Sequence, residues 1–163
     1  MGIISFFKDA GEKLFGHAAV PAAASDPAAA QAQSVAANQT AGQAIAKYIA
    51  SQNLSAQNLA VEYDGASSTV TVSGVAPDQA TKEKIVLCCG NVHSVAKVND
   101  QLTVEQPAEE SKFHTVASGD TLSAIAKQYY GNANSYMKIF EANKPMLSDP
   151  NKIYPGQLLR IPA

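Results

Sequence analysis

The sequence lacks tryptophan, carries little net charge and contains only two cysteines. The formal net charge is −2 over 163 residues, which is too small to indicate nucleic acid or a strongly anionic membrane as a partner. The two cysteines, Cys88 and Cys89, are adjacent, so they form neither a spaced disulfide framework nor a Cys/His cluster with zinc-ligand spacing. We therefore expect both to be small, buried, hydrophobic side chains.

Long hydrophobic runs are also missing. No segment approaches the roughly 20 apolar residues that a membrane-spanning helix needs, so we expect no stable membrane insertion. The first apolar run stops at Lys8, which is too early for a secretory signal peptide. Phe6 stands where a myristoylation signal has Ser or Thr. These features predict a protein that stays in the cytoplasm.

Residues for catalysis are present but do not form a recognisable pattern. Asp120 and Glu141 are candidates for a carboxylate pair, although a turn explains the first and an exposed helix face explains the second. The side chains that could form a nucleophilic triad, namely His93, His114 and Ser123, show no such arrangement. We predict that the protein is not an enzyme.

The first 16 residues form a short amphipathic segment. Ile3, Phe6, Phe7 and Ala10 can share one helical face, with charged residues largely on the other faces. A short apolar helix of this kind lies on a membrane or packs on its own protein. Because the polar face is not basic, we favour packing.

Two stretches are predicted to be linkers. Residues 17–41 are rich in alanine and hold no large apolar stripe, so they can bury little surface. We expect a flexible linker there that gains helix toward its end. A second, shorter linker is expected over residues 106–112.

Residues 42–105 predict a small α+β domain in the order helix, strand, strand, helix, strand. The first two strands form a hairpin through a turn at Asp64 and Gly65. Asp78 is a suitable N-cap for the second helix, which ends near Gly90. The final strand is expected to carry Val95, Val98, Leu102 and Val104.

Residues 113–163 predict a second α+β domain in the order strand, helix, helix, strand, with both helices on one face of the sheet. Asp120 follows a turn glycine and can cap the first helix, and Gly131 ends that helix. Leu158 to Ile161 forms the returning strand after a Pro-Gly turn.

This second domain resembles the LysM module over its whole length. The matching residues are Val116, Gly119-Asp120-Thr121-Leu122, Ile125-Ala126, Tyr130-Gly131, Ala142-Asn143, Ile153, Pro155-Gly156-Gln157, Leu159 and Ile161-Pro162. LysM modules bind N-acetylglucosamine polymers such as peptidoglycan or chitin, so the resemblance implies a sugar groove. Its two implied walls are Gly119, Asp120, Thr121 and Leu122, and, opposite them, Asn143, Lys144, Pro145 and Met146.

The first domain resembles the BON domain, a module often linked to envelope proteins and phospholipid contact. The matching residues are Val70, Val72, Gly74, Val75, the run Asn91 to Asp100, Leu102 and Val104. Where the family often has glycine before the valine that opens the final strand, this sequence has Ser94.

A short amphipathic start followed by BON and LysM domains, without a signal peptide, resembles a family of bacterial cytoplasmic potassium-binding proteins. The resemblance implies a protein that binds K⁺ selectively and senses its cytoplasmic level. We further expect a monomer that takes Rb⁺ and Cs⁺ as surrogates and has an unidentified protein partner. Residue by residue, it implies carbonyl ligands at Phe7, Ala10, Glu12, Gly90, Val92 and Val95.

Backbone chemistry is compatible with such a site. K⁺ suits a ring of carbonyl oxygens that replaces its water shell, and helix C-termini offer carbonyls without an intrahelical partner. The two candidate turns are Ala10 to Glu12 and Gly90 to Val95. The residues alone favour the interpretation that both turns are simple helix ends, whereas the resemblance favours an ion site. Peptidoglycan binding through the LysM groove is the alternative function.

Overall fold

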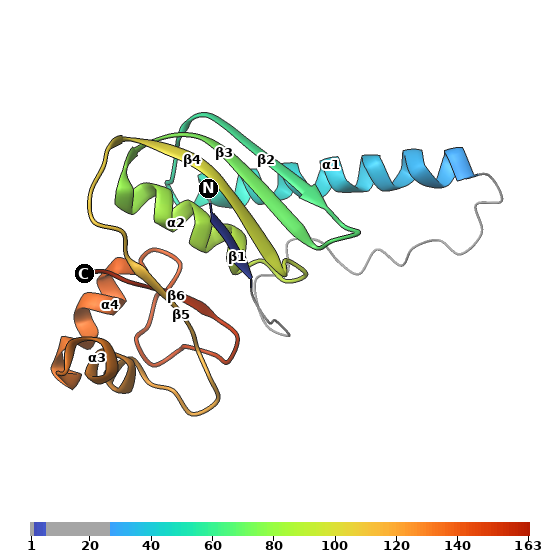
Figure 1. The fold of residues 1–163 in the computed structure, drawn as a ribbon. Helices are drawn as coiled ribbons and strands as arrows, with labels where there is room; N and C mark the ends of the chain where they lie inside the picture. Colours follow the sequence, from blue (N-terminus) through green and yellow to red (C-terminus); the bar gives the residue numbers. More distant parts are fainter. Residues whose placement is uncertain (1, 6–26) are drawn as a thin grey trace.

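The computed structural model describes residues 2–5 and 27–163 and contains two α+β units that lie against each other (Figure 1). The first unit is a four-stranded sheet with two helices on one face, and the second is a two-stranded sheet with two short helices. The α+β fold class and both predicted orders of elements are confirmed.

The elements are short except for the first helix. The first unit consists of β1 (Gly2–Ser5), α1 (Pro27–Ser51), β2 (Gln57–Asp64), β3 (Thr69–Asp78), α2 (Gln79–Gly90) and β4 (Lys97–Gln106). The second unit consists of β5 (Lys112–Thr115), α3 (Leu122–Tyr130), the 3-10 turn η1 (Ala133–Ser135), α4 (Tyr136–Ala142) and β6 (Leu158–Ile161). The larger sheet has the order β1-β4-β3-β2, in which β3 and β4 are parallel and both outer pairs are antiparallel.

The N-terminal segment differs from the prediction. Residues 2–5 form β1, which pairs antiparallel with β4 and ends with Ser5 opposite Lys97. Placing Ile3 on a helical face was therefore wrong. Ile3 and Ile4 are β-branched and suit a strand, and the edge of β4 offers backbone groups that need partners. The other members of the expected helical face lie outside the described residues: Phe6, Phe7 and Ala10.

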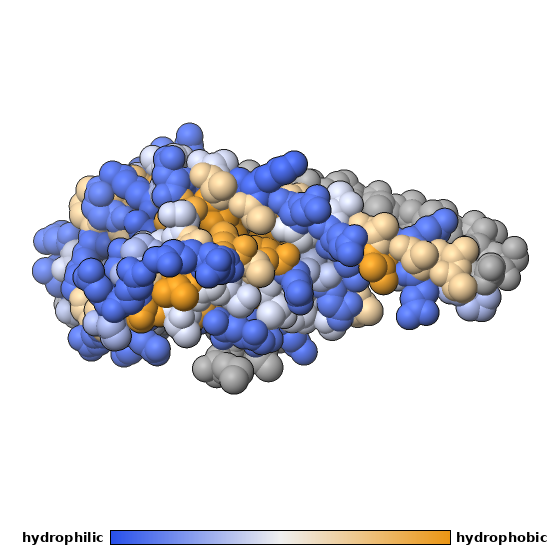
Figure 2. Space-filling view, turned by 90° about the horizontal axis from the view of Figure 1, so that it is seen from above, coloured by the Kyte–Doolittle hydropathy of each residue, from blue (hydrophilic) through white to orange (hydrophobic). Residues whose placement is uncertain are grey.

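Helix α1 is longer than predicted, because it begins at Pro27 and takes up part of the stretch expected to be a linker, residues 17–41. Proline is favoured at the start of a helix, and alanine is the strongest helix former. The expectation of little burial does hold for the first half of α1, which projects beyond the sheet and carries exposed apolar residues such as Val35 (Figures 1 and 2). The buried residues lie in its second half: Ala41, Gly42, Ile45 and Ile49.

Alternate residues of the strands form the core of the first unit. Val70 and Val72 of β3 are fully buried, as is Val98 of β4, and they pack with residues of both helices. Cys88 and Cys89 are free thiols in this core, as predicted, and burial raises the pKa of Cys88 to about 12. Among the described residues, none of the helices has the length and apolar character to cross a membrane.

Strand β6 is buried on both of its faces. Leu159 and Ile161 belong to the core of the second unit, together with residues of α3 and α4. Leu158, whose side chain points the other way because strand residues alternate, belongs to the core of the first unit. Phe113 of β5 and Met146 pack against that same core. The two units therefore share apolar packing through β6.

Helix α1 lies very close to β2 at Gly42. A Cβ atom at this position would lie 2.7 Å from the backbone carbonyl oxygen of Val61, a separation that requires the backbone to move. Glycine in a helix otherwise costs about 1 kcal/mol relative to alanine. The steric need for glycine, where helix and sheet come close together, is therefore more important at this position than the higher helix propensity of alanine.

We predict that Gly42→Ala lowers the free energy of unfolding by about 1–3 kcal/mol, as expected for overpacking, although helix propensity alone predicts a gain. Urea unfolding measures the change. Gln43→Ala, at the neighbouring exposed position, is the control and should change stability by less than about 0.5 kcal/mol. A more stable Gly42→Ala variant would contradict the close packing of α1 on β2.

Candidate functional site

The turn between α2 and β4 begins where the chain leaves the helix. Asn91 is the C-cap residue, and its N–H donates to the carbonyl of Leu87 at 3.0 Å. The Val95 N–H donates to the carbonyl of Val92 at 3.2 Å and closes the turn. Ser94 has φ 75°, in the left-handed region where glycine is favoured, which explains why a glycine fits this position in BON domains.

Three of the predicted carbonyl ligands lie in this turn. Gly90, Val92 and Val95 are buried, and Val95 precedes β4 instead of belonging to it as expected. Among the backbone hydrogen bonds that link described residues of the turn, none ends on the carbonyl oxygen of Gly90 or Val95. Carbonyls at the end of a helix carry partial negative charge, so the turn offers buried oxygen atoms that fit a cation.

The other three predicted ligands, Phe7, Ala10 and Glu12, lie outside the described residues. The described part of the N-terminus nevertheless ends beside the turn, because Ser5 pairs with Lys97 at the start of β4. Elsewhere, no group of three or more His, Cys, Asp or Glu side chains forms a metal-ligand cluster among residues 2–5 and 27–163.

The turn also contacts the second unit through the side chain of Asn91. Its Oδ1 accepts from the backbone N–H of Leu158 at 2.8 Å, and its Nδ2 donates to the carbonyl of Leu158 at 2.9 Å. One turn further back in α2, the Cys88 Sγ lies 3.1 Å from the Met146 Sδ. Sequence reasoning missed these contacts, because a single asparagine 67 residues from its partner leaves no periodic signal.

A buried ion pair joins the two units at the other end of their contact. The Arg160 Nε lies 2.5 Å from the Glu83 Oε2, and the Glu83 Oε1 accepts from the side chain of Gln79 and the backbone N–H of Ser111. Burial by itself raises the pKa of Glu83, but these hydrogen bonds outweigh burial and leave the pKa below its ordinary 4.5. The carboxylate is therefore charged and fully partnered at neutral pH.

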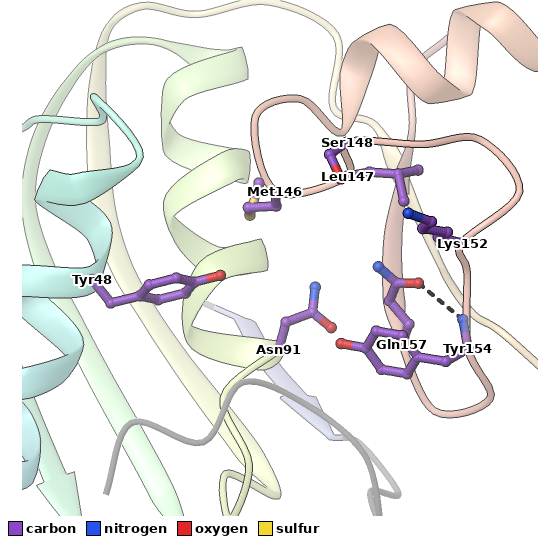
Figure 3. Close-up of a pocket in the computed structure, with 8 residues that line it drawn as sticks. All are labelled: Tyr48, Asn91, Met146, Leu147, Ser148, Lys152, Tyr154 and Gln157. Carbon is purple, nitrogen blue, oxygen red and sulfur yellow. Dashed lines mark hydrogen bonds between the residues drawn. The ribbon is translucent and has the colours of Figure 1, made fainter.

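A small cavity of about 110 Å³ lies beside Asn91, where the two units meet. Figure 3 shows that Tyr48 of α1 and Asn91 face the loop of the second unit that carries Lys152, Tyr154 and Gln157. The remaining lining residues are Met146, Leu147 and Ser148. Met146, implied to be a wall of the sugar groove, thus lies at the junction of the two units.

A second hollow, of about 350 Å³, lies on the surface of the LysM-like unit. Asp120, Thr121 and Leu122, three of the residues that the resemblance implies for a sugar groove, line it. The described residues that complete it are Ser123, Tyr136, Pro150, Asn151 and Ile153. In the loop between α4 and β6, the later residues Pro150, Asn151 and Ile153 line this hollow, and residues 143–146 do not.

The other implied groove residues have different surroundings. Asn143 is 1% exposed, and its side chain pairs with the backbone N–H and carbonyl of Arg160. Lys144 forms an exposed ion pair with Glu141 at 2.7 Å. Pro145 and Gly119 are exposed. Asn143 is thus a structural residue that fastens the loop after α4 to β6.

Asp120 does not cap α3, contrary to the expectation. Thr121 is the N-cap, and its hydroxyl accepts from the Ala124 N–H at 3.1 Å. The Asp120 Oδ2 accepts from the Ala117 N–H at 2.9 Å and lies 3.0 Å from the Nε2 of His114. These two partners, the Ala117 N–H first, lower the pKa of Asp120. Asp120 therefore fastens the turn to β5.

Comparison with known proteins agrees with both resemblances. Residues 36–106 match the BON domain family and residues 114–162 match the LysM domain family, neither of which is an enzyme family. A protein of Escherichia coli O6:H1 named "Potassium binding protein Kbp" is 46% identical over 163 residues, which cover 99% of each chain.

Two further relatives match smaller parts. An uncharacterized protein of Deinococcus radiodurans is 37% identical over 108 residues, or 66% of this chain and 35% of its own length. The uncharacterized protein YqbP of Bacillus subtilis is 37% identical over 60 residues, or 31% of this chain and 27% of its own length.

We predict that Arg160→Met lowers the free energy of unfolding by about 3 kcal/mol at pH 7, because it leaves the buried Glu83 carboxylate without its cation. Glu83 has a lowered pKa in the folded protein, so the stabilisation that it provides is present above pH 4.5 and is lost as the pH falls through the folded pKa. The loss caused by Arg160→Met should therefore shrink below pH 4.5. Denaturant unfolding at a series of pH values measures it.

Lys144→Met is the control for this ion pair, because it breaks the exposed pair with Glu141. Exposed pairs contribute less than about 1 kcal/mol, and we expect that small effect here. An Arg160→Met effect of the same small size would show that the buried pair does not hold the two units together.

Proposed function

The chain belongs to the family of BON–LysM proteins that includes the potassium-binding protein of Escherichia coli, and from this premise we propose that it binds potassium ions selectively. The observation that carries the proposal is the identity of 46% across 99% of both chains. A match of this extent includes the N-terminal segment and the turn after α2 as well as the two domains.

The ion is held by backbone carbonyl oxygens from two segments. The proposed ligands are Phe7, Ala10, Glu12, Gly90, Val92 and Val95. The position of β1 supports this set, because Ser5 lies opposite Lys97, at the end of the turn that carries Val95. Phe7 follows Ser5 by two residues, a stretch of at most about 7 Å, so its carbonyl can reach the turn.

Carbonyl ligands explain the choice of ion. K⁺ is large and weakly hydrated, and a ring of carbonyl oxygens replaces its water shell. The buried end of α2 adds the partial negative charge of a helix C-terminus. Rb⁺ and Cs⁺ are larger ions of the same charge and bind as surrogates, whereas Na⁺ is too small to contact all the oxygens of such a ring.

Ion binding also changes the conformation. A cation held by two segments distant in sequence ties them together, and binding to the ordered state shifts the population toward it. The N-terminal segment docks on the BON domain when K⁺ is bound, and the particle becomes more compact. A monomer that responds in this way acts as a cytoplasmic potassium sensor and presents a K⁺-dependent surface to a protein partner.

We predict that calorimetry at equal ionic strength detects K⁺ binding that is at least about tenfold tighter than Na⁺ binding, a difference of about 1.4 kcal/mol. Small-angle scattering of the same samples should show a smaller radius of gyration in KCl than in NaCl. Equal heats for the two salts would refute the proposed ion, and identical scattering profiles would refute the conformational change.

Two variants locate the site. A chain without residues 1–15 loses three of the six proposed ligands and should lose K⁺ binding. Asn151→Ala changes a residue in the hollow of the LysM domain and should leave K⁺ affinity unchanged. Full affinity in the truncated chain would place the ion elsewhere.

The LysM domain supports a second candidate function, the binding of N-acetylglucosamine polymers such as peptidoglycan. The observation that favours it is the hollow of about 350 Å³ beside Asp120, Thr121 and Leu122. Exposed Asn151 and the ring of Tyr136 also line this hollow, so it combines a hydrogen-bonding amide with an apolar surface. Sugars bind to surfaces that combine these two kinds of group.

If the hollow binds sugar, sedimentation with purified peptidoglycan should pellet the protein to the same extent in KCl and NaCl. Asn151→Ala should then reduce pelleting several-fold, because it removes a side-chain amide that hydrogen-bonds the sugar. Asn134→Ala, at an exposed position that does not line the hollow, is the matched control. Sugar binding at this hollow would be refuted if the protein did not pellet with peptidoglycan, or if both variants reduced pelleting equally.

A further inference from the structure

Strand β6 is held by two asparagine side chains that form the same pair of bonds. Asn143, from the LysM domain itself, accepts from the Arg160 N–H at 2.7 Å and donates to the Arg160 carbonyl at 2.8 Å. Asn91, from the BON domain, accepts from the Leu158 N–H at 2.8 Å and donates to the Leu158 carbonyl at 2.9 Å. Each amide side chain pairs with β6 as a neighbouring strand would.

Only Asn91 connects this strand to the candidate cation site. It stands between Gly90 and Val92, two of the proposed ligands, and it is 6% exposed. Figure 3 shows its side chain extending from the end of α2 toward the LysM domain. The carbonyl of Gly90 belongs to the peptide unit that ends at the nitrogen of Asn91, so the two share one rigid plane.

We infer that Asn91 is a positioning residue for the cation site, and that its pairing with Leu158 contributes to the discrimination between K⁺ and Na⁺. This inference rests on the proposed function. The Asn91 side chain itself is occupied by the two bonds to Leu158, so it acts on the ion only through the backbone of the turn.

The physical basis is the orientation of the turn. An amide that donates and accepts at the same residue cannot rotate without breaking both bonds, and a buried polar group that loses its partner is costly. The turn is therefore fixed by a strand outside its own domain. Carbonyls fixed at a spacing suited to K⁺ cannot move inward around the smaller Na⁺, so a looser turn should lose selectivity.

The test compares Asn91→Ala with Met146→Ala. Both residues line the same cavity between the domains, but Met146 makes its sulfur contact with Cys88 inside α2, whereas Asn91 is itself part of the turn. Calorimetry with KCl and NaCl should show that Asn91→Ala lowers the ratio of K⁺ to Na⁺ affinity about tenfold, the effect of losing two hydrogen bonds. Met146→Ala should lower overall stability but leave the ratio unchanged. The inference would be overturned if the ratio of K⁺ to Na⁺ affinity were the same in the unaltered protein and both variants. It would also be overturned if both variants lowered this ratio equally.

A measurement on the unaltered protein is independent of how well the variants fold. Hydrogen exchange followed by NMR should show that the Leu158 amide exchanges about tenfold more slowly in KCl than in NaCl, because K⁺ orders the turn that accepts its hydrogen bond. The Arg160 amide, which donates to Asn143 in the same strand, is the internal control and should change little. Equal slowing of both amides, or no slowing of Leu158, would overturn the inference.

These experiments separate the inference from the proposed function. If the unaltered protein does not distinguish K⁺ from Na⁺, the proposed function fails. If the unaltered protein distinguishes the two ions and Asn91→Ala does so equally well, the function stands and the positioning role of Asn91 fails.

Discussion

The structure depends on the packing of one short strand, β6, on both of its faces. Leu159 and Ile161 complete the core of the LysM domain, while Leu158 enters the core of the BON domain. Since successive side chains of a strand point to opposite faces, each domain uses alternate residues of the same strand. A shift of β6 by one residue would therefore place the wrong side chains in both cores at once, which fixes the register of the contact between the domains.

Polar groups around β6 add specificity to this apolar contact. Glu83 and Arg160 are 4% and 11% exposed at their side chains, and each is placed by further hydrogen bonds from its own domain. Buried charges contribute little net stability when they are satisfied but are costly when one partner is removed. The BON and LysM domains thus have one favoured arrangement, in which the end of α2 and the turn between α2 and β4 face β6.

The parts of the fold that follow a local period were predictable from the sequence. Alternation marked Val70 and Val72 as core residues of a strand, and Gly131 ends α3 with φ 70° as expected. The N-terminal strand was not predictable, because Ile3 and Ile4 suit a helical face as well as a strand, and distant β4 decides between them. In the candidate site, helix-end chemistry indicated the turn of Gly90 to Val95, and family resemblance selected the ligands there, which stay a prediction. The partners of Asn91 and Glu83 were not predicted, since isolated polar residues 67 and 77 positions from their partners carry no pattern.

The pairing of β1 with β4 has a consequence for the order of synthesis. Gly2–Ser5 is made before all the other described elements, and its partners, Lys97 to Asp100, are made only after α1, β2, β3 and α2. At a synthesis rate of about 5–20 residues per second, β4 is completed roughly 5–20 s after β1. During that time the hairpin of β2 and β3 can already form with α1. Strand β1 is thus added at the edge of a largely assembled sheet, so a strand made early is incorporated after strands that are made later.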